Sequence, residues 1–206
     1  MRWCMPSTYD LKQKFSGLLR PVANALVRGG ISANAVTNFA TLLSIGFGAL
    51  IYFMPTTRLI FLLFPLLLLV RMALNNIDGV IAREHDQKTP LGGYLNELGD
   101  VVSDAALYLP FARVAGFSLE AVLLFVFTGV VAEFSGVLAH AQGKERSYRG
   151  PSTKSDRALI MALLSLAIFF GLTQPAVING VLLVMSALSL LTISNRIKYG
   201  TAVDHA

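Results

Sequence analysis

Apolar stretches long enough to cross a membrane recur along this chain, with short polar loops between them. An α-helix needs about 20 apolar residues to cross a hydrocarbon core roughly 30 Å thick. Six stretches of this length are predicted, at about 32–53, 58–83, 91–114, 119–142, 155–172 and 176–196. Charged residues make up only 14% of the chain, against about 25% in a soluble domain. The sequence therefore predicts an all-α integral membrane protein with six transmembrane helices.

The segment before the first predicted span has the pattern of a basic amphipathic helix over residues 9–28. Its apolar residues recur at intervals of three or four: Leu11, Phe15, Leu18, Val22 and Leu26. Such a helix is suited to an anionic membrane surface, and packing against the bundle is compatible with that interpretation. We expect a cytoplasmic N-terminus with this interfacial helix over 1–30, a six-helix domain over 31–198 and a cytoplasmic tail over 199–206.

Lysine and arginine are distributed unequally between the two sets of predicted loops. Fourteen of them fall on the side that carries both termini, and only Arg58 and Arg113 fall on the other. The side with more positive charge is cytoplasmic in membrane proteins. This asymmetry also accounts for the formal net charge of +5, so no nucleic-acid partner is expected.

Polar side chains cluster in two neighbouring predicted spans, where their burial in lipid is costly and indicates function. The second span carries Asn75 and Asp78, and the third carries Asn96, Asp100 and Asp104 at four-residue intervals that place them on one helix face. The loop between these spans is short, so the two polar faces can meet. Crowded carboxylates repel one another unless they are neutralised. Magnesium, which typically binds one or two carboxylates plus substrate phosphates, would neutralise them.

Glycines accompany these polar residues. Gly79 follows Asp78, and Gly92 and Gly93 open the third span. Glycine inside a helix costs about 1 kcal/mol relative to alanine. Two explanations stay open: close approach of a ligand to the backbone, and close packing of helices in lipid.

These residues together resemble the pattern of the CDP-alcohol phosphotransferase family, D-x2-D-G-x2-A-R-x8-G-x3-D-x3-D. All the spacings match, and six of the eight positions match in residue type. The two departures are asparagines at the first and third aspartate positions. The matching residues are Asn75, Asp78, Gly79, Ala82, Arg83, Gly92, Asn96 and Asp100. The chain resembles in particular an enterobacterial branch of the family that carries the same two asparagines.

The resemblance implies a reaction in which an acceptor hydroxyl attacks a CDP-linked lipid donor such as CDP-diacylglycerol, and CMP leaves. It implies one or two Mg²⁺ or Mn²⁺ ions, a homodimer, and a bacterial inner membrane with the active site on the cytoplasmic side. Asp78 and Asp100 would ligate metal, with Asp100 also a candidate general base, and Asn75 and Asn96 would ligate through amide oxygens or donate hydrogen bonds. The expected CDP-binding residues are Gly79, Ala82, Arg83, Gly92, Asn34 and Thr37.

The asparagines leave a charge deficit. Asp78 and Asp100 bring a formal charge of −2 where four aspartates would bring −4. Asp104, or Glu97, could supply a further carboxylate. A single metal, or a second metal that binds only together with the pyrophosphate, follows as a hypothesis.

Other polar residues permit both a functional and a structural interpretation. Arg149, Lys154 and Arg157 match a region that, in the related enzymes, receives a phosphorylated acceptor; they also fit an ordinary basic loop. Arg71 could orient the site or pair with Glu133. Asn34 and Thr37 could cap a helix instead of touching the nucleotide.

Two competing functions remain. A transporter would need polar groups through the whole membrane thickness, whereas the outer halves of these spans are apolar. A weakened or non-catalytic family member that binds CDP-lipid is favoured by the two asparagines. The identity of the acceptor alcohol is not determined by the sequence.

Overall fold

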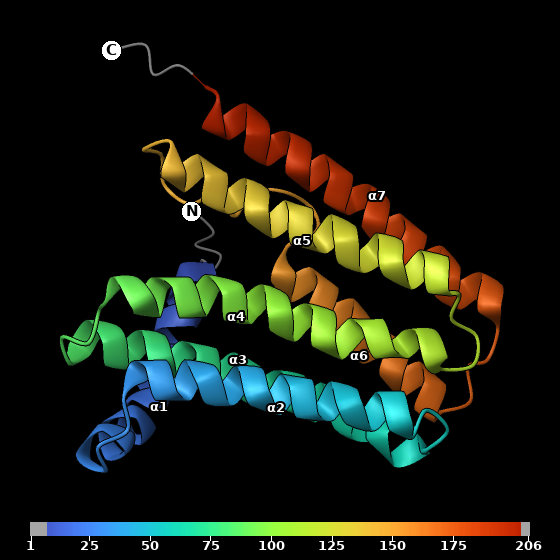
Figure 1. The fold of residues 1–206 in the computed structure, drawn as a ribbon, viewed down its shortest axis with the longest axis horizontal. Coiled ribbons are helices and arrows are strands. Elements are labelled where there is room, and N and C mark those ends of the chain that lie inside the picture. Colours follow the sequence, from blue (N-terminus) through green and yellow to red (C-terminus); the bar gives the residue numbers. More distant parts are fainter. Residues whose placement is uncertain (1–7, 203–206) are drawn as a thin grey trace, which may run out of the picture. The chain divides into compact units, whose positions relative to one another are not determined.

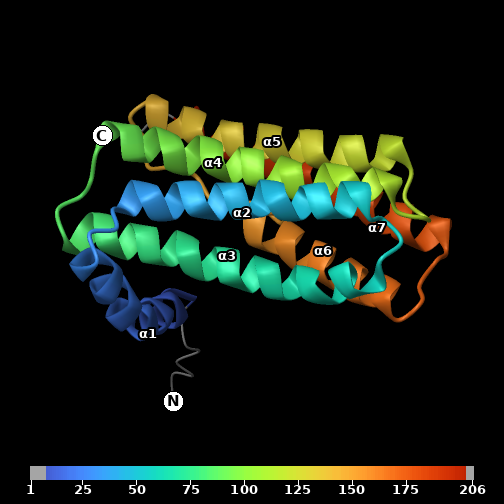
Figure 2. The same cartoon turned by 60° about the horizontal axis from the view of Figure 1, so that its bottom comes forward.

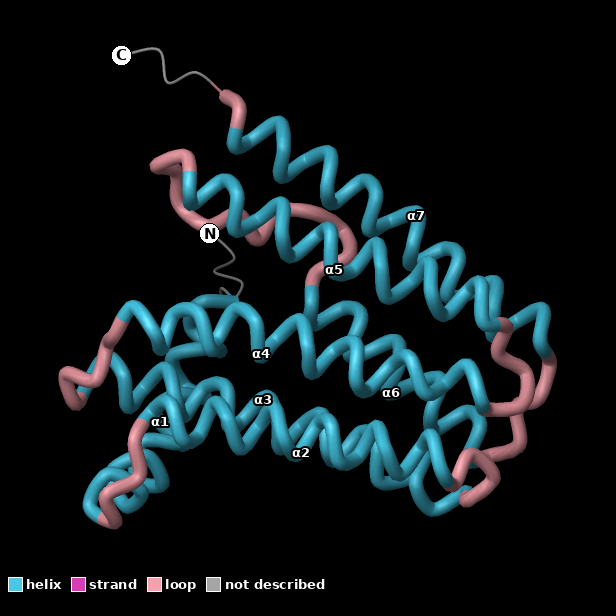
Figure 3. Tube along the Cα trace, in the orientation of Figure 1, coloured by secondary structure: helices cyan, strands magenta, loops and turns pink. Residues whose placement is uncertain are grey.

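The computed structural model describes residues 8–202, with side chains from Ser16 onward, and this range contains only helices and loops (Figures 1 and 3). The helices are α1 (Thr8–Arg28), α2 (Ala33–Phe53), α3 (Arg58–Glu84), α4 (Pro90–Tyr108), the 3₁₀ helix η1 (Leu109–Arg113), α5 (Leu119–Ala141), α6 (Lys154–Phe169) and α7 (Pro175–Gly200). The expected all-α class is confirmed.

Four of these helices are long and apolar enough to cross a membrane: α2, α3, α5 and α7. The chain is an integral membrane protein. Of the other two predicted spans, α4 has 19 residues and carries three carboxylates, while α6 has only 16 residues. Length and apolar composition therefore identify four candidate spans, and the six-span layout stays a proposal.

Two helices end earlier than predicted, each for a local reason. The α-helical part of the third predicted span ends at Tyr108, and the chain continues as η1 with Pro110 in its first turn. Proline has no N–H to donate to the carbonyl four residues back and its ring crowds that carbonyl, which favours an end of the α-helix just before Pro110. At the end of α6, Gly171 has φ +101°, and Leu172 N donates to the Ala167 carbonyl at 2.8 Å. These two features form a Schellman motif that stops the helix at Phe169.

The fold divides into two compact units, which are described separately: Met1–Leu43 with Leu69–Ser103, and Ser44–Leu68 with Asp104–Ala206. The first unit contains α1, the start of α2, the end of α3 and most of α4. Figure 2 shows α1 lying beside the adjoining ends of α2 and α3. A Schellman motif also ends α1, where Gly30 has φ +77° and Ile31 N donates to the Leu26 carbonyl at 3.0 Å.

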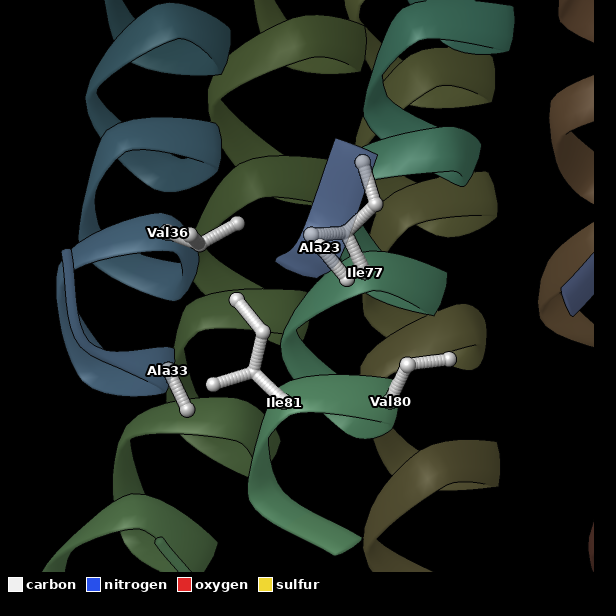
Figure 4. Packing of buried hydrophobic residues seen from close by; sticks show 6 residues of the cluster. All are labelled: Ala23, Ala33, Val36, Ile77, Val80 and Ile81. Carbon is white, nitrogen blue, oxygen red and sulfur yellow. The ribbon is translucent and has the colours of Figure 1, made fainter. Parts of the chain in front are cut away.

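A small apolar core joins α1, α2 and α3 in the first unit. Its members are Ala23 from α1, Ala33 and Val36 from α2, and Ile77, Val80 and Ile81 from α3 (Figure 4). Leu19, Leu26 and Val27 of α1 also pack against it, whereas Leu18 and Val22 are exposed. The first predicted helix therefore exists and packs on the bundle along one face. The side chains of Leu11 and Phe15 lie outside the described side chains.

The second unit is built around α5 and α7, which lie side by side (Figure 1). Phe111 of η1 is fully buried, with ring centroids 5.1 Å from Phe64 and 5.2 Å from Phe117. Ser165 of α6 donates to the Phe61 carbonyl at 2.7 Å. These contacts connect α3, η1 and α6 within the unit.

Candidate active site

Asp100 is held by two residues of α3 that lie one turn apart. Asn75 Nδ2 donates to Asp100 Oδ1 at 2.9 Å. Arg71 Nη2 lies 3.6 Å from the same carboxylate oxygen and donates to the Asp100 backbone carbonyl at 3.1 Å. Arg71 is only 4% exposed. The structure thus gives Arg71 a role in orienting a site residue, and it joins the polar faces of α3 and α4 as predicted.

Asp78 is the second carboxylate of the motif and is buried, with 6% of its surface exposed. Thr37 Oγ1 of α2 donates to Asp78 Oδ2 at 2.7 Å. Thr37 was expected to touch the nucleotide or to cap α2. The capping hydroxyl is that of Ser32, which accepts from Ala35 N at 3.2 Å, so Thr37 does not cap the helix. Its contact with the nucleotide stays a prediction.

The glycines of the motif lie under polar side chains of the same unit. A Cβ added to Gly92 would lie 2.8 Å from Asn34 Oδ1, and one added to Gly79 would lie 3.0 Å from Arg83 Nη1. Glycine at these two positions therefore lets the Asn34 amide and the Arg83 guanidinium lie directly on the helix backbone. The sequence left two explanations open for these glycines, close approach of a ligand and close packing of helices. The structure adds a third, which is room for a neighbouring polar side chain.

Three remaining motif residues differ in their surroundings. Asn96 is half-buried on α4, on the helix face that also carries Asp100. Ala82 packs against the apolar core of the first unit, which gives it a packing role besides the expected space for the nucleotide. Asp104 belongs to the second unit, is 8% exposed, and lies 3.6 Å from Arg157 Nη2.

The side chains that could bind a metal ion include few ionisable groups. Within residues 8–202, no group of three or more His, Cys, Asp or Glu side chains is placed to hold a metal ion. The reason is visible in the sequence, since two of the four family aspartate positions are Asn75 and Asn96. Carboxylate and amide oxygens are hard ligands that suit Mg²⁺ or Mn²⁺. Two carboxylates and two amides therefore fit one divalent cation by charge and by ligand type.

The three expected acceptor-binding cations lie in different environments of the second unit. Arg149 is exposed, with its guanidinium 4.2 Å from the centre of the Tyr199 ring. It lines a pocket of about 380 Å³ together with Asn195, Lys198, Tyr199 and Ala202. Lys154 is half-buried in the first turn of α6.

Arg157 is buried, with 2% of its surface exposed, and its Nη2 lies 3.1 Å from Glu133 Oε1. Glu133, which the sequence offered as a possible partner of Arg71, is buried and forms ion pairs with Arg157, Arg146 and Arg196. Sequence reasoning did not identify Arg146 and Arg196 as members of this cluster. The sequence does hold a signal for them, since Gly129 and Gly136 lie one turn on either side of Glu133. Glycines so placed leave room on the helix for large side chains near the carboxylate.

The fold and the site together define an integral membrane protein with a polar centre made by α2, α3 and α4. A sequence model described as CDP-alcohol phosphatidyltransferase matches residues 31–193. The chain belongs to the CDP-alcohol phosphatidyltransferase family. The expected reaction class follows: metal-dependent transfer of a phosphatidyl-type group from a CDP-linked donor to an alcohol, in phospholipid synthesis.

Curated relatives agree with this assignment. The inner membrane protein YnbA of Escherichia coli is 45% identical over 160 residues, which cover 78% of this chain and 79% of the relative. A phosphatidylinositol phosphate synthase of Mycobacteroides abscessus is 28% identical over 202 residues, covering 90% of this chain and 84% of the relative.

Solved structures share the fold. The phosphatidylinositol phosphate synthase of Mycobacterium tuberculosis, crystallised with manganese and citrate, superimposes with a TM-score of 0.71 at 22% identity, over 90% of both chains. The same enzyme with CDP-DAG bound gives a TM-score of 0.69 at 21% identity, over 90% of this chain and 94% of that chain.

Proposed function

We propose that this protein transfers the phosphatidyl group of CDP-diacylglycerol to the hydroxyl of an acceptor alcohol, with release of CMP at the cytoplasmic face of the membrane. The observation that carries this proposal is the contact between Asn75 and Asp100. It joins the two halves of the family motif, which lie on separate helices, into one polar centre. The presence of manganese in one structure of the Mycobacterium tuberculosis enzyme and of bound CDP-DAG in another supports the choice of cofactor and donor.

Four side chains would hold the metal: Asp78, Asp100, Asn75 and Asn96. A bound divalent cation supplies electrophilic stabilisation of charge on the donor's pyrophosphate. Thr37 orients Asp78, and Arg71 orients Asp100, before any ligand arrives. Asp104 is left out of this set because its carboxylate pairs with Arg157. We infer one tightly bound ion, with a second arriving only together with the pyrophosphate.

Asp100 would take the proton of the acceptor hydroxyl. The hydroxyl oxygen then forms a bond to the lipid-linked phosphorus, and the bond from that phosphorus to the CMP oxygen breaks. A general base must lie within hydrogen-bond reach of the proton it removes. The contacts from Arg71 and Asn75 hold Asp100 Oδ1, and Oδ2 is the oxygen proposed to take the proton.

The nucleotide end of the donor would be held by Asn34, Gly79, Arg83 and Gly92. Thr37 would contribute by orienting Asp78, and Ala82 would contribute to the shape of the site. Arg83 is exposed, and its guanidinium lies across Gly79. A guanidinium in that position can neutralise pyrophosphate charge. The acceptor would be received by Arg149 and Lys154, and Arg157 is paired with Glu133.

In the membrane, we propose six spans with both termini in the cytoplasm, α1 on the cytoplasmic surface, and the bacterial inner membrane as the location. The exposed side chains of Leu18 and Val22 leave an apolar surface on α1 that suits an interfacial position. A homodimer belongs to the same proposal and is supported by the family resemblance alone.

The experiment that tests this function incubates the purified protein with CDP-diacylglycerol, Mg²⁺ or Mn²⁺ and a panel of acceptor alcohols. CMP and the lipid product are then measured by mass spectrometry. We expect CMP and a phosphodiester lipid to form together. Asp100→Asn should lower kcat by about 100-fold or more, the size typical for loss of a general base. Asp86→Asn is the matched control, because Asp86 is exposed and has φ 53°, which asparagine tolerates.

The competing interpretation, a weakened family member that only binds CDP-lipid, is separated by the same assay. If the native protein releases no CMP and the double substitution Asn75→Asp with Asn96→Asp releases it rapidly, the weakened-member interpretation is correct. Full activity in Asp100→Asn would remove the general-base assignment. Metal-binding isotherms test the stoichiometry, and two tight ions without CDP-lipid would exclude the one-ion hypothesis.

A further inference from the structure

A single buried carboxylate in the second unit is surrounded by three arginines from different segments. Glu133, on α5, is 7% exposed. Its Oε1 lies 3.1 Å from Arg157 Nη2 of α6 and 3.6 Å from Arg196 Nη1 of α7. Its Oε2 lies 3.4 Å from Arg146 Nη2, in the loop between α5 and α6. We name Glu133 with these three residues the arginine cluster.

The surface of α5 is shaped to admit these guanidinium groups. A Cβ on Gly129 would lie 3.0 Å from Arg157 Nε, and one on Gly136 would lie 3.2 Å from Arg196 Nη1. The two glycines therefore lie one turn before and about one turn after Glu133, on the same helix face. A side chain at Gly129 would displace the Arg157 guanidinium, whereas one at Gly136 would first meet the Ser147 carbonyl oxygen at 2.7 Å and then Arg196 Nη1. The two glycines therefore leave room on α5 for both arginines and for the loop that carries Arg146.

The arginines are also fixed from behind. Arg196 Nη1 donates to the Ala132 carbonyl, and its Nε donates to the Arg149 carbonyl at 3.2 Å. Arg157 Nη1 donates to the Ser152 carbonyl at 3.3 Å, and its Nη2 faces Asp104 as well as Glu133. Arg157 and Arg196 are 2% and 1% exposed. The cluster thus lies against the loop and the first turn of α6, the segment from which the acceptor-binding cations come.

The chemistry of such a cluster is that of an anion site. The guanidinium fork matches a carboxylate and a phosphate equally well. Ser147, next to Arg146 in the chain, adds a buried hydroxyl oxygen that has no hydrogen-bond partner among the described residues. Here the carboxylate of Glu133 occupies the centre of that site. An incoming phosphate would have to compete with Glu133 for the same guanidinium groups and would place a second negative charge beside a buried carboxylate, which is unfavourable.

We propose that Glu133 is the resident anion of the arginine cluster and a specificity-determining residue, and that the acceptor alcohol therefore carries no phosphate group. This inference rests on the proposed function, since it names the acceptor class of that reaction. It replaces the expectation of a phosphorylated acceptor, because Arg157 already has an internal counter-ion.

The first test uses the native protein. CMP release is compared for paired acceptors that differ only in a phosphate, glycerol against glycerol 3-phosphate and inositol against inositol 1-phosphate. We expect kcat/KM to be higher for the plain alcohol by about tenfold or more, since a buried carboxylate opposes a like charge. A preference for the phosphorylated member of either pair overturns the proposal.

The second test removes the resident anion with Glu133→Gln, which keeps the shape of the side chain. We expect inorganic phosphate to raise the melting temperature of this variant by about 3 °C or more, and not that of the native protein. We also expect the ratio of rates with phosphorylated and plain acceptor to rise about tenfold, with KM for CDP-diacylglycerol unchanged. Glu120→Gln, on the exposed first turn of α5, is the matched control and should change neither readout.

The outcomes separate the two proposals. If the native protein releases no CMP with any acceptor, the proposed function fails, and the phosphate-induced shift of Glu133→Gln still decides whether the cluster is an anion site. If CMP is released but Glu133→Gln gains neither the shift nor the use of phosphorylated acceptor, the resident-anion inference fails alone. Should Glu133→Gln not fold, the paired acceptors on the native protein decide the inference.

Discussion

At the scale of single residues, the exchange of aspartate for asparagine changes what holds the site together. An aspartate at position 75 would place a second carboxylate beside Asp100, where like charges repel without a cation. Asn75 instead donates a hydrogen bond at 2.9 Å to the carboxylate. The pair is therefore stable without metal, and less negative charge is left to attract one.

The substitution Asn75→Asp should make the site depend on metal. In EDTA we expect a loss of about 1–3 kcal/mol of stability, because a favourable hydrogen bond is replaced by repulsion. Mn²⁺ should restore the melting temperature and should stabilise the variant more than the native protein. Thermal unfolding with and without Mn²⁺ measures this, and Asn38→Asp, at an exposed position of α2, is the control. An equal loss with and without Mn²⁺ would contradict the explanation.

At the scale of secondary-structure elements, glycines set how closely α2 and α4 approach. In the first unit, a Cβ on Gly92 or Gly99 would meet the side chain of Asn34 or Thr41 at 2.8 or 2.7 Å. In the second unit, a Cβ on Gly48 would overlap the Ala106 carbonyl oxygen. Small residues at helix contacts are typical of membrane proteins, because they allow the backbones to pack closely. Only the contacts at Gly92 and Gly99 involve polar side chains, so we expect the substitutions to have different effects.

For the polar contact, Gly92→Ala should affect activity more than stability. The new methyl group displaces the Asn34 amide, a small group that can move, but not the backbone. We expect kcat/KM for CDP-diacylglycerol to fall about 10- to 100-fold, as for other small displacements of binding groups. Gly93→Ala is the matched control, since a Cβ there meets nothing within 4 Å. Equal effects of the two substitutions in the CMP-release assay would refute a role for Asn34.

For the backbone contact, Gly48→Ala should affect stability. The two helices must separate or bend to admit the methyl group, and overpacking of this kind costs about 1–3 kcal/mol. The measurement is thermal unfolding of the purified protein in detergent. Gly46→Ala, two residues earlier and without any neighbour within 4 Å of its Cβ, should leave the melting temperature unchanged or raise it. A stable Gly48→Ala variant would show that this contact is looser than described.

At the scale of the whole molecule, the distribution of charge predicts the orientation in the membrane. In the proposed six-span layout, fourteen lysines and arginines would lie on the side of the termini and two on the other. The motif residues at the end of α3 and the start of α4 would lie on the first side. The nucleotide of a CDP-linked donor is therefore expected to meet its site from the cytoplasm, while the acyl chains stay in the bilayer.

Cysteine labelling tests this orientation. In a Cys4→Ser background, Glu120→Cys and Glu145→Cys each place a single thiol at an exposed position. Glu120 lies at the start of α5, and Glu145 lies in the loop after its end. A membrane-impermeant maleimide applied to intact cells should label Glu120→Cys and leave Glu145→Cys unlabelled until the membrane is opened. Labelling in the reverse pattern would place the site on the outer side, against the positive-inside rule.

Much of the fold could be predicted from the sequence because its signals are local. Length and apolar content located the helices. The early ends of α4 and α6 were missed although Pro110 and Gly171 stand in the sequence, because span length alone was used to end these helices. The four-residue spacing of Asn96, Asp100 and Asp104 predicted a shared face, which follows directly from helix geometry.

The sequence by itself determined the class of protein, the family motif and the meeting of Asn75 with Asp100, since short loops and helical periodicity leave few alternatives. Only the tertiary structure decided which charged groups neutralise one another. Arg71 pairs with Asp100, Thr37 binds Asp78, and Glu133 gathers three arginines from distant segments. Ion pairs between remote segments depend on helix rotation and on the space left by residues such as Gly129 and Gly136, and neither quantity is present in local sequence periodicity.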